Sequence, residues 1–531
     1  MISQRESWIP DVNEAQRQKK RLRGNTAMNN YLFDAIRNAA TPHACFIETP
    51  DGGRLSYADM FDRSGRLAAA IAELGVLPGD RVAVQVEKSP DALMLYLAGL
   101  RAGAVYLPLN TAYTLKELDY FVGDAEPKLI VVSSKSLDGA RAIASAHGAH
   151  VATLDDTGSG SLLDLAHTKS ADFADARREG DDLAAILYTS GTTGRSKGAM
   201  LTHDNLLSNA VTLRRAWRFT HADRLIHALP IFHTHGLFVA TNVTLLAGAS
   251  MYLLPKFDPH EVLQLMPTSS VLMGVPTFYV RLLQHPGLTR EATAGMRLFV
   301  SGSAPLLTET HRGFSEKTGH AILERYGMTE TNMNTSNPYV GDRIAGTVGF
   351  PLEGVEVRIT DPDSGRTLAC EETGMIEVKG PNVFRGYWRM PEKTAAEFRA
   401  DGFFITGDLG KIDERGYVHI VGRGKDLVIS GGYSIYPKEV ETEIDSLPGV
   451  VESAVIGVPH PDFGEGVTAV VVAGKDIGLD EQTVLDGLED RLARYKQPKR
   501  VIFVDELPRN TMGKVQKNLL REAYAKLYSK S

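Results

Sequence analysis

Helical and strand-like patterns alternate along the first part of the chain, and this alternation constrains the fold more than any other feature. Apolar residues recur at helical spacing over 57–75, and a second helical pattern over 90–103 opens with proline and closes with glycine. Strand-like runs cover 80–87 and 128–134. Such alternation predicts an α/β fold of several layers with mostly parallel sheets.

The 531 residues exceed what one core holds, since single cores stop growing near ~250–300 residues. From Val355 onward, short strands, glycine-rich turns and charges indicate a β-rich subdomain. The clearest boundary is "GRGKD", Gly422–Asp426, and the residues after it carry helix and strand patterns of their own. We predict a poorly ordered extension at 1–27, a large N-terminal domain at 28–422, a hinge at 423–426 and a small mobile α+β domain at 427–531.

The N-terminal residues contain a basic run at 17–24 that Glu6, Asp11 and Glu14 precede. Import leaders avoid acidic residues, which favours a solvated, poorly ordered extension. Organelle import and a patch for polyanions are the alternatives for this run. Met28 directly precedes the first helical pattern and is a second candidate for the start of the protein.

Composition excludes several classes of function. The formal net charge of -7 argues against a nucleic-acid-coating role. No apolar run approaches the ~18 residues of a membrane span. Cys45 and Cys370 are the two cysteines, too few for a disulfide framework, which indicates a reducing compartment. We therefore expect a cytoplasmic protein without a nucleic-acid partner or stable membrane association.

The stretch "LYTSGTTGRSKGAML", Leu187–Leu201, has the composition of a phosphate-binding loop. It continues an apolar strand pattern and is followed by a helical one. Gly191 and Gly194 let backbone N–H groups turn toward an anion, and Lys197 adds a mobile positive charge. Ser196 precedes the lysine, so this is not the common nucleoside-triphosphate loop, which has glycine there. A polar surface turn is the alternative, and the flanking strand and helix disfavour it.

Further motifs follow in a fixed order: SGSAPL (301–306), ERYGMTET (324–331), TGDLG (406–410), GRGKD (422–426), SGGYSIYPKEVE (430–441) and PRNTMGKVQK (508–517). From about Asn29 to the C-terminus the chain thereby resembles the adenylate-forming superfamily. This superfamily contains acyl-CoA synthetases, peptide-synthetase adenylation domains and firefly-type luciferases. Ser196 stands where the family more usually has proline; this change removes a φ restriction and leaves Lys197 in place.

The resemblance implies a ligase that uses ATP and coenzyme A as cosubstrates. A carboxylate attacks the α-phosphate of ATP, giving an acyl-adenylate and pyrophosphate, and a thiol then displaces AMP. Because the attack joins two anions, it needs neutralising charge from Mg²⁺ and a lysine. By resemblance the catalytic residues are Lys514, Glu330 and Thr189, with Glu330 and Thr189 as Mg²⁺ ligands. Lys514 belongs to the small domain, which must therefore move for the thiol step.

The resemblance also assigns the nucleotide contacts. Tyr326 would lie flat on adenine, Asp408 would accept hydrogen bonds from both ribose hydroxyls, and the loop would hold the departing β- and γ-phosphates. The ATP site expected in this way comprises Thr189, Ser190, Gly191, Thr192, Thr193, Gly194, Lys197, Ser303, Ala304, Glu324, Arg325, Tyr326, Gly327, Met328, Thr329, Asp408, Arg423 and Lys514.

Lys425 matches the family's hinge position, and Gly431, Gly432 and Tyr433 match its pantetheine channel, where missing Cβ atoms leave room. We also hypothesise that a protein lysine acetyltransferase acts on Lys514, because loss of the charge would stop adenylation. Mass spectrometry that finds only unmodified Lys514 in protein from acetate-grown cells would count against this hypothesis.

The acyl substrate is predicted from residues 274–283. Arg281 follows Phe278 by three residues and Thr277 by four, so the three share one face of a helix. If that face lines the pocket, the buried guanidinium needs an anionic partner, which a second carboxylate on the substrate would supply in a bidentate fork. Projection into solvent or pairing with a local acid is the equally weighted alternative.

"HALPIFHTHGLFVATNVTL", "VPTFYVRLL" and "YGMTETNMNTS" resemble malonyl-CoA synthetases in particular. This resemblance implies malonate or methylmalonate as substrate, with Arg281, Ser303 and His233 at the acyl group. His235 is an alternative to His233, and an uncharged packing histidine is the alternative for both.

Four other functions compete. Amino-acid adenylation domains carry an aspartate for the substrate ammonium, where this chain has Phe232-His233. Arg281 disfavours a medium- or long-chain acyl-CoA synthetase, because a pocket for a fatty acid should be apolar throughout. Loss of Lys514 or Glu330 would favour an inactive nucleotide-binding or scaffold protein, but both residues are present. A luciferase-like oxygenase has no positive sign in the sequence.

Overall fold

The computed structural model describes residues 29–189, 196–430, 433–474, 478–492, 494–510 and 513–528. The predicted extension at 1–27, the loop residues 190–194, and Gly431 and Gly432 lie outside the described residues. Tyr433 is described by its backbone alone. None of the helices in these ranges is long and apolar enough to cross a membrane.

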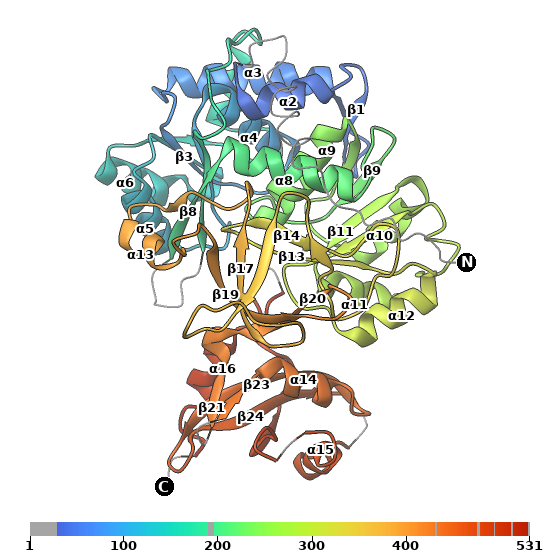
Figure 1. The fold of residues 1–531 in the computed structure, drawn as a ribbon. Coiled ribbons are helices and arrows are strands. Elements are labelled where there is room, and N and C mark those ends of the chain that lie inside the picture. Colours follow the sequence, from blue (N-terminus) through green and yellow to red (C-terminus); the bar gives the residue numbers. More distant parts are fainter. Residues whose placement is uncertain are drawn as a thin grey trace, which may run out of the picture.

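Two large sheets with helices around them form the N-terminal domain, which confirms the predicted α/β class (Figure 1). In the first sheet, the strand order is β18-β8-β7-β4-β3-β5-β6. Strands β3 to β7 run parallel to one another, whereas β8 pairs antiparallel with β7 and β18 pairs antiparallel with β8. The strands are β3 Arg81–Gln85, β4 Val105–Pro108, β5 Leu129–Val132, β6 His150–Thr153, β7 Leu183–Thr189, β8 Lys197–Thr202 and β18 Gly386–Tyr387.

The helices of this part begin and end where the local sequence requires. The side chains of Ser56 and Asp59 form a capping box at the start of α3 (Tyr57–Glu73). Helix α4 (Pro90–Ala102) has proline in its first turn and ends at Gly103, whose φ of 70° suits glycine. The remaining helices are α2 Tyr31–Ala39, α5 Leu115–Ala125, α6 Leu137–His147 and α7 Ser161–His167.

The phosphate-type loop joins two antiparallel strands, and this detail differs from the strand–loop–helix order read from the sequence. Strand β8 begins at Lys197 and pairs with β7, with Thr189 opposite Lys197. Helix α8 (His203–Ala216) starts only after β8, capped by the Thr202 side chain. Strand β8 has only six residues and directly follows the glycine-rich loop, so its strand pattern is not distinguishable in the sequence.

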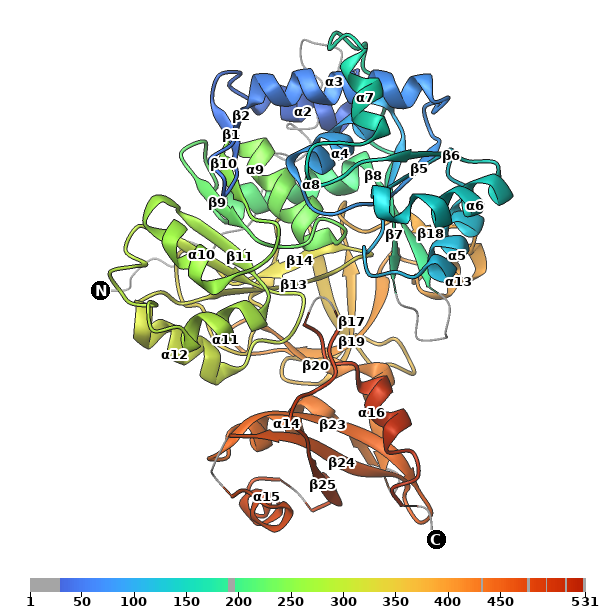
Figure 2. The same cartoon turned by 180° about the vertical axis from the view of Figure 1, so that it is seen from behind.

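The second large sheet has the order β15-β14-β13-β12-β11-β9-β10-β1-β2, and its central strands run parallel. Figure 2 shows helices α10, α11 and α12 together beside it. The strands are β1 Cys45–Glu48, β2 Arg54–Ser56, β9 Arg224–His227, β10 Ser250–Leu253, β11 Val271–Gly274, β12 Leu298–Ser301, β13 Leu323–Met328, β14 Asn332–Ser336 and β15 Phe350–Pro351. The helices are α9 Asn242–Ala247, α10 Pro259–Leu265, α11 Pro276–Gln284 and α12 Thr308–Thr318, and a π-helix covers His235–Thr241.

A four-stranded antiparallel sheet completes the large domain and is the predicted β-rich subdomain. Its order is β16-β17-β19-β20, with β16 Glu356–Thr360, β17 Gly374–Lys379, β19 Phe404–Ile412 and β20 Val418–Arg423. Helix α13 (Pro391–Ala396) precedes β19. Strand β20 is the last element before the small domain, so the chain leaves the large domain at Arg423.

The small domain is an α+β unit with a core of its own, at the bottom of Figure 1. A turn of 3₁₀-helix at Gly424–Asp426 connects it to β20, at the position where the hinge is predicted. Its sheet has the order β22-β21-β24-β23, with β25 beside β24. The elements are β21 Val428–Ser430, β22 Tyr433–Ile435, α14 Pro437–Asp445, β23 Val450–His460, β24 Gly464–Ala473, α15 Glu481–Leu488, β25 Arg500–Phe503 and α16 Lys517–Ala523.

Candidate active site

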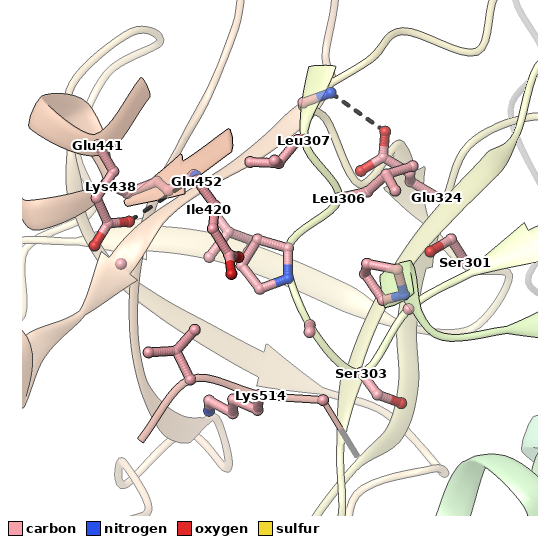
Figure 3. A pocket seen from close by; sticks show the side chains of 18 of the residues that line it. Ser301, Ser303, Leu306, Leu307, Glu324, Ile420, Lys438, Glu441, Glu452 and Lys514 are labelled. Atoms are coloured by element: carbon pink, nitrogen blue, oxygen red, sulfur yellow. Dashed lines mark hydrogen bonds and ion pairs between the residues drawn. The ribbon is translucent and has the colours of Figure 1, made fainter. Parts of the chain in front are cut away.

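A cavity of about 320 Å³ lies where the large and small domains meet (Figure 3). The carboxyl ends of β12 and β13 supply one wall, which is where parallel sheets commonly bind ligands. Residues of β19 and β20 supply a second wall, and the small domain closes the third side with Lys514 and part of α14. The cavity therefore brings together motifs that lie more than two hundred residues apart in the sequence.

A hydrogen-bonded group of Tyr326, Asp408 and Arg423 lines this cavity. The Tyr326 hydroxyl donates to the Asp408 carboxylate at 2.6 Å, and Arg423 Nε lies 2.9 Å from its other oxygen. The antiparallel register places Asp408 opposite Arg423 on β19 and β20. Burial and the Asp408 charge raise the pKa of Tyr326, so the hydroxyl stays protonated. An aromatic ring, a carboxylate and a guanidinium thus meet at one place, as the ATP prediction requires.

Glu324 is buried in the same wall and accepts a hydrogen bond from Gly346 N at 3.3 Å. Burial raises the pKa of Glu324 to about 8, so the carboxyl is largely protonated at neutral pH. Ser303 and Ala304 also line the cavity. Ser303 has a φ of 71°, a backbone conformation that is uncommon outside glycine. Gly327 lines the cavity as well, whereas Met328 and Thr329 lie beyond its wall.

Lys514 reaches the cavity from the small domain, from a tight turn built on Asn510. The Lys514 N–H donates to the Asn510 side chain and the Asn510 N–H to the Lys514 carbonyl, both at 2.9 Å. Gly513 between them has a φ of 74°. Burial, reinforced by the charge of Arg423, lowers the pKa of Lys514 to about 8. The structure therefore holds the two domains with Lys514 at the cavity that Tyr326, Asp408 and Arg423 also line.

Glu330 and Lys197 lie near one another but are not paired. The Glu330 carboxylate is buried and contacts the Tyr387 hydroxyl at 3.1 Å. Lys197 lies 3.4 Å from Glu397, a carboxylate that the sequence did not single out. Burial raises the pKa of Glu330 against the smaller, opposite effects of the Lys197 and Arg423 charges, and no cation within the described ranges forms an ion pair with it. A buried carboxylate without an ionic partner fits a divalent cation such as Mg²⁺. Thr189, the other predicted metal ligand, ends β7 opposite Lys197.

Arg281 is not among the residues that line this cavity, which agrees with the alternative that its side chain projects into solvent; its role at the acyl group stays a prediction. Pro276, Thr277 and Val280 are the residues of α11 at the cavity, and Arg281 is exposed. Tyr279 and Leu282 form the buried face of this helix. Arg281 therefore belongs to the exposed part of this helix.

A different arginine occupies the buried position. Arg325 of β13 is 3% exposed and lines the cavity. Its Nε and Nη2 have no hydrogen-bond partner among the described residues. Burial lowers the pKa of Arg325 to about 9, so it remains charged at neutral pH. The sequence had assigned this residue to ATP, and its position in the ERYGMTET motif gave no sign of the buried charge.

Two buried histidines lie close to Arg325 and to Ser303, behind the residues that line the cavity. Ser303 Oγ lies 3.2 Å from His235 Nδ1. His233 Nδ1 and His235 Nε2 are buried without a partner within the described part of the chain. Burial, together with the charge of Arg325, lowers the pKa of His233 to about 4 and that of His235 well below its usual value. Both imidazoles are therefore neutral and can offer hydrogen bonds to a ligand.

The predicted hinge and coenzyme A residues are placed only in part. Lys425 lies in the 3₁₀ turn between the domains, and burial lowers its pKa. The neighbouring Asp426 accepts a hydrogen bond from Arg521 of α16 at 2.7 Å. Gly431 and Gly432 are outside the described residues, so the predicted pantetheine channel stays a prediction.

Comparisons with known proteins agree with this geometry. The sequence matches the AMP-binding enzyme family over 34–388 and the AMP-binding enzyme C-terminal domain over 439–514. A feruloyl-CoA synthase of Amycolatopsis sp. is 37% identical over 493 residues, 92% of this chain and 97% of that protein. A malonate–CoA ligase of Arabidopsis thaliana is 36% identical over 482 residues, 85% of this chain and 79% of that protein.

Among solved structures, ATP-bound MatB from Rhodopseudomonas palustris is 66% identical and covers 94% of this chain and 100% of its own, with a TM-score of 0.93. The apo form of that protein has a TM-score of 0.83. The domain arrangement described above is thus more similar to the ATP-bound form than to the apo form. The chain belongs to the AMP-binding enzyme family and is an AMP-forming acid–CoA ligase.

Proposed function

We propose that this enzyme joins malonate, with methylmalonate as a second substrate, to coenzyme A through an acyl-adenylate. The observation that carries the proposal is the buried guanidinium of Arg325, a residue of the cavity wall whose Nε and Nη2 have no hydrogen-bond partner among the described residues. An apolar acyl chain would leave this charge buried without a partner, which is costly. A second carboxylate on the substrate would satisfy it in a charge-assisted, two-bond contact.

The surrounding groups support the same substrate. His233 and His235 are neutral and donate hydrogen bonds without adding charge, and Ser303 adds a hydroxyl. The curated relatives include ligases for feruloyl, malonyl and long-chain acyl groups, so overall identity does not choose among these acids. The polar, cationic end of the cavity favours the small dicarboxylate.

The chain's own residues then divide the work of adenylation. Tyr326 and Glu324 hold the adenine end, and Asp408 and Arg423 hold the ribose. Lys514 neutralises the attacking carboxylate and the α-phosphate as they approach, the largest electrostatic demand of the step. Glu330 would hold Mg²⁺, which supplies further neutralising charge at the phosphates. Lys197 would bind the departing pyrophosphate as a point charge.

A substrate panel tests the proposal. Pyrophosphate release with ATP should be greatest with malonate, lower with methylmalonate, and small with acetate, octanoate and ferulate. Malonyl-CoA formation, followed by mass spectrometry, should need both ATP and coenzyme A. Equal rates with octanoate or ferulate would contradict the dicarboxylate assignment while leaving the ligase class intact.

A further inference from the structure

The hydroxyl of Tyr387 lies between two carboxylates. It donates to Glu397 at 2.7 Å and lies 3.1 Å from Glu330. Tyr387 is buried, and burial together with the Glu330 charge raises its pKa, so the hydroxyl keeps its proton. A hydroxyl has one hydrogen to donate and serves one acceptor at a time. The shorter contact belongs to Glu397, and Glu330 is left with the weaker one.

Lys197 contacts the same tyrosine from another side. Its Nζ lies 4.1 Å from the centre of the Tyr387 ring and 3.4 Å from Glu397. A lysine over an aromatic face gains from the negative charge density of the ring. Lys393 lies 2.7 Å from the same carboxylate oxygen of Glu397. Tyr387 and Glu397 together therefore fix where the Lys197 ammonium lies.

This arrangement keeps opposite charges apart in a place where they would otherwise attract. Lys197 and Glu330 are close enough that the lysine charge lowers the pKa of the carboxyl against the larger effect of burial. Inside a protein such a pair attracts far more strongly than in water. A direct Lys197–Glu330 ion pair would use up both the cation proposed for the phosphates and the carboxylate proposed for Mg²⁺.

We propose that Tyr387 and Glu397 are positioning residues that keep Lys197 and Glu330 from pairing with each other until ATP binds. Glu397 holds the lysine over the tyrosine ring, and the phosphate oxygens of ATP then replace Glu397 as its partner. The proposal rests on the roles proposed above for Glu330 and Lys197. It does not depend on which carboxylic acid is the substrate.

Calorimetric titration of ATP at a series of Mg²⁺ concentrations, without any carboxylic acid, tests this. In Glu397→Gln the lysine is free to pair with Glu330 and compete with the metal. The Mg²⁺ concentration for half-maximal ATP binding should rise about tenfold, or ~1.4 kcal/mol. Tyr387→Phe keeps the ring and should give a smaller rise. Glu371→Gln removes the charge of an exposed glutamate paired with Lys411 and should leave Mg²⁺ dependence unchanged.

A double variant separates positioning from a general loss of structure. With Lys197→Met nothing competes for Glu330, so adding Glu397→Gln should not change the Mg²⁺ requirement further. Independent, additive effects of the two substitutions would overturn the proposal, as would unchanged Mg²⁺ dependence in Glu397→Gln. Glu330→Gln provides the last comparison. If it leaves Mg²⁺ dependence unchanged, the metal role of Glu330 fails, and the positioning proposal fails with it.

Discussion

The guanidinium of Arg325 packs directly against the backbone of Gly302. A Cβ atom at position 302 would stand 2.4 Å from the guanidinium carbon, closer than side chains approach one another. The backbone of Gly302 is not left-handed, so this contact alone explains the need for glycine. The short turn after β12 thus leaves room for the Arg325 guanidinium, the buried charge that we propose binds the substrate.

Gly302→Ala should therefore displace Arg325 without removing it. We expect a loss of about 1–3 kcal/mol in the free energy of unfolding from overpacking. The KM for malonate should rise about tenfold, ~1.4 kcal/mol, with a smaller change in the KM for ATP. Gly313→Ala in α12, where an added Cβ would meet only Leu283 at an ordinary 3.9 Å, is the control and should keep wild-type kinetics. An unchanged malonate KM in a folded Gly302→Ala enzyme would separate Arg325 from the acyl site.

Removal of the guanidinium is the more direct test, and the chain offers two arginines for comparison. Arg325→Met should lower kcat/KM for malonate. The corresponding loss of transition-state stabilisation should be on the order of 2–3 kcal/mol, the value of hydrogen bonds to a charged group. Arg281→Met, on the exposed face of α11, should change kcat/KM for malonate little. Steady-state rates of pyrophosphate release measure both. The reverse ranking would restore Arg281 as the residue that binds the second carboxylate.

These two arginines also show what the sequence can and cannot predict. The α/β class, the β-rich subdomain and the small domain follow from local patterns, because helices such as α3 and α4 carry their own start and stop signals. Helical spacing shows that Arg281 and Thr277 lie near one face. It does not show which part of that face another element covers, and this depends on the packing of α11 in three dimensions.

Long-range contacts account for the other differences. The burial of Arg325 depends on Gly302, which is distant in the sequence and adjacent only because β12 and β13 are neighbouring strands. The Tyr387–Glu330 contact joins residues 57 apart. No local pattern marks either pair. Motif order predicted Tyr326, Asp408, Arg423 and Lys514 as one site because each motif supplies its chemistry from a short, continuous stretch, and the structure brings these residues to one cavity.

Glu324 should make stability depend on pH. Its pKa of about 8 lies above the 4.5 of an exposed glutamate, so the folded chain binds more protons than the unfolded one between these values. Its contribution to stability is complete below about pH 4.5 and is lost as pH rises through 8. Glu324→Gln should remove this part of the decline in stability with rising pH. The difference in Tm between the wild type and Glu324→Gln from pH 5 to pH 9 measures it. Parallel Tm curves would contradict the raised pKa.

The same reasoning predicts how ATP use by the free enzyme depends on pH. Lys514 has a pKa lowered to about 8, so its ammonium loses its proton as pH rises above that value. Because kcat/KM reports ionisations of the free enzyme, kcat/KM for ATP should fall about tenfold per pH unit above pH 8. Lys514→Arg keeps its charge to higher pH, so its decline should begin at least one unit later even if its rate is lower.

Thermal unfolding provides the control, because the two effects of Lys514 have opposite signs. Between about pH 8 and 10.5 the unfolded chain binds more protons at this lysine than the folded chain, so its contribution to stability rises with pH. A fall in kcat/KM without a fall in Tm therefore identifies titration of the lysine, and a fall in both identifies unfolding. If wild type and Lys514→Arg decline at the same pH, a different group controls the use of ATP.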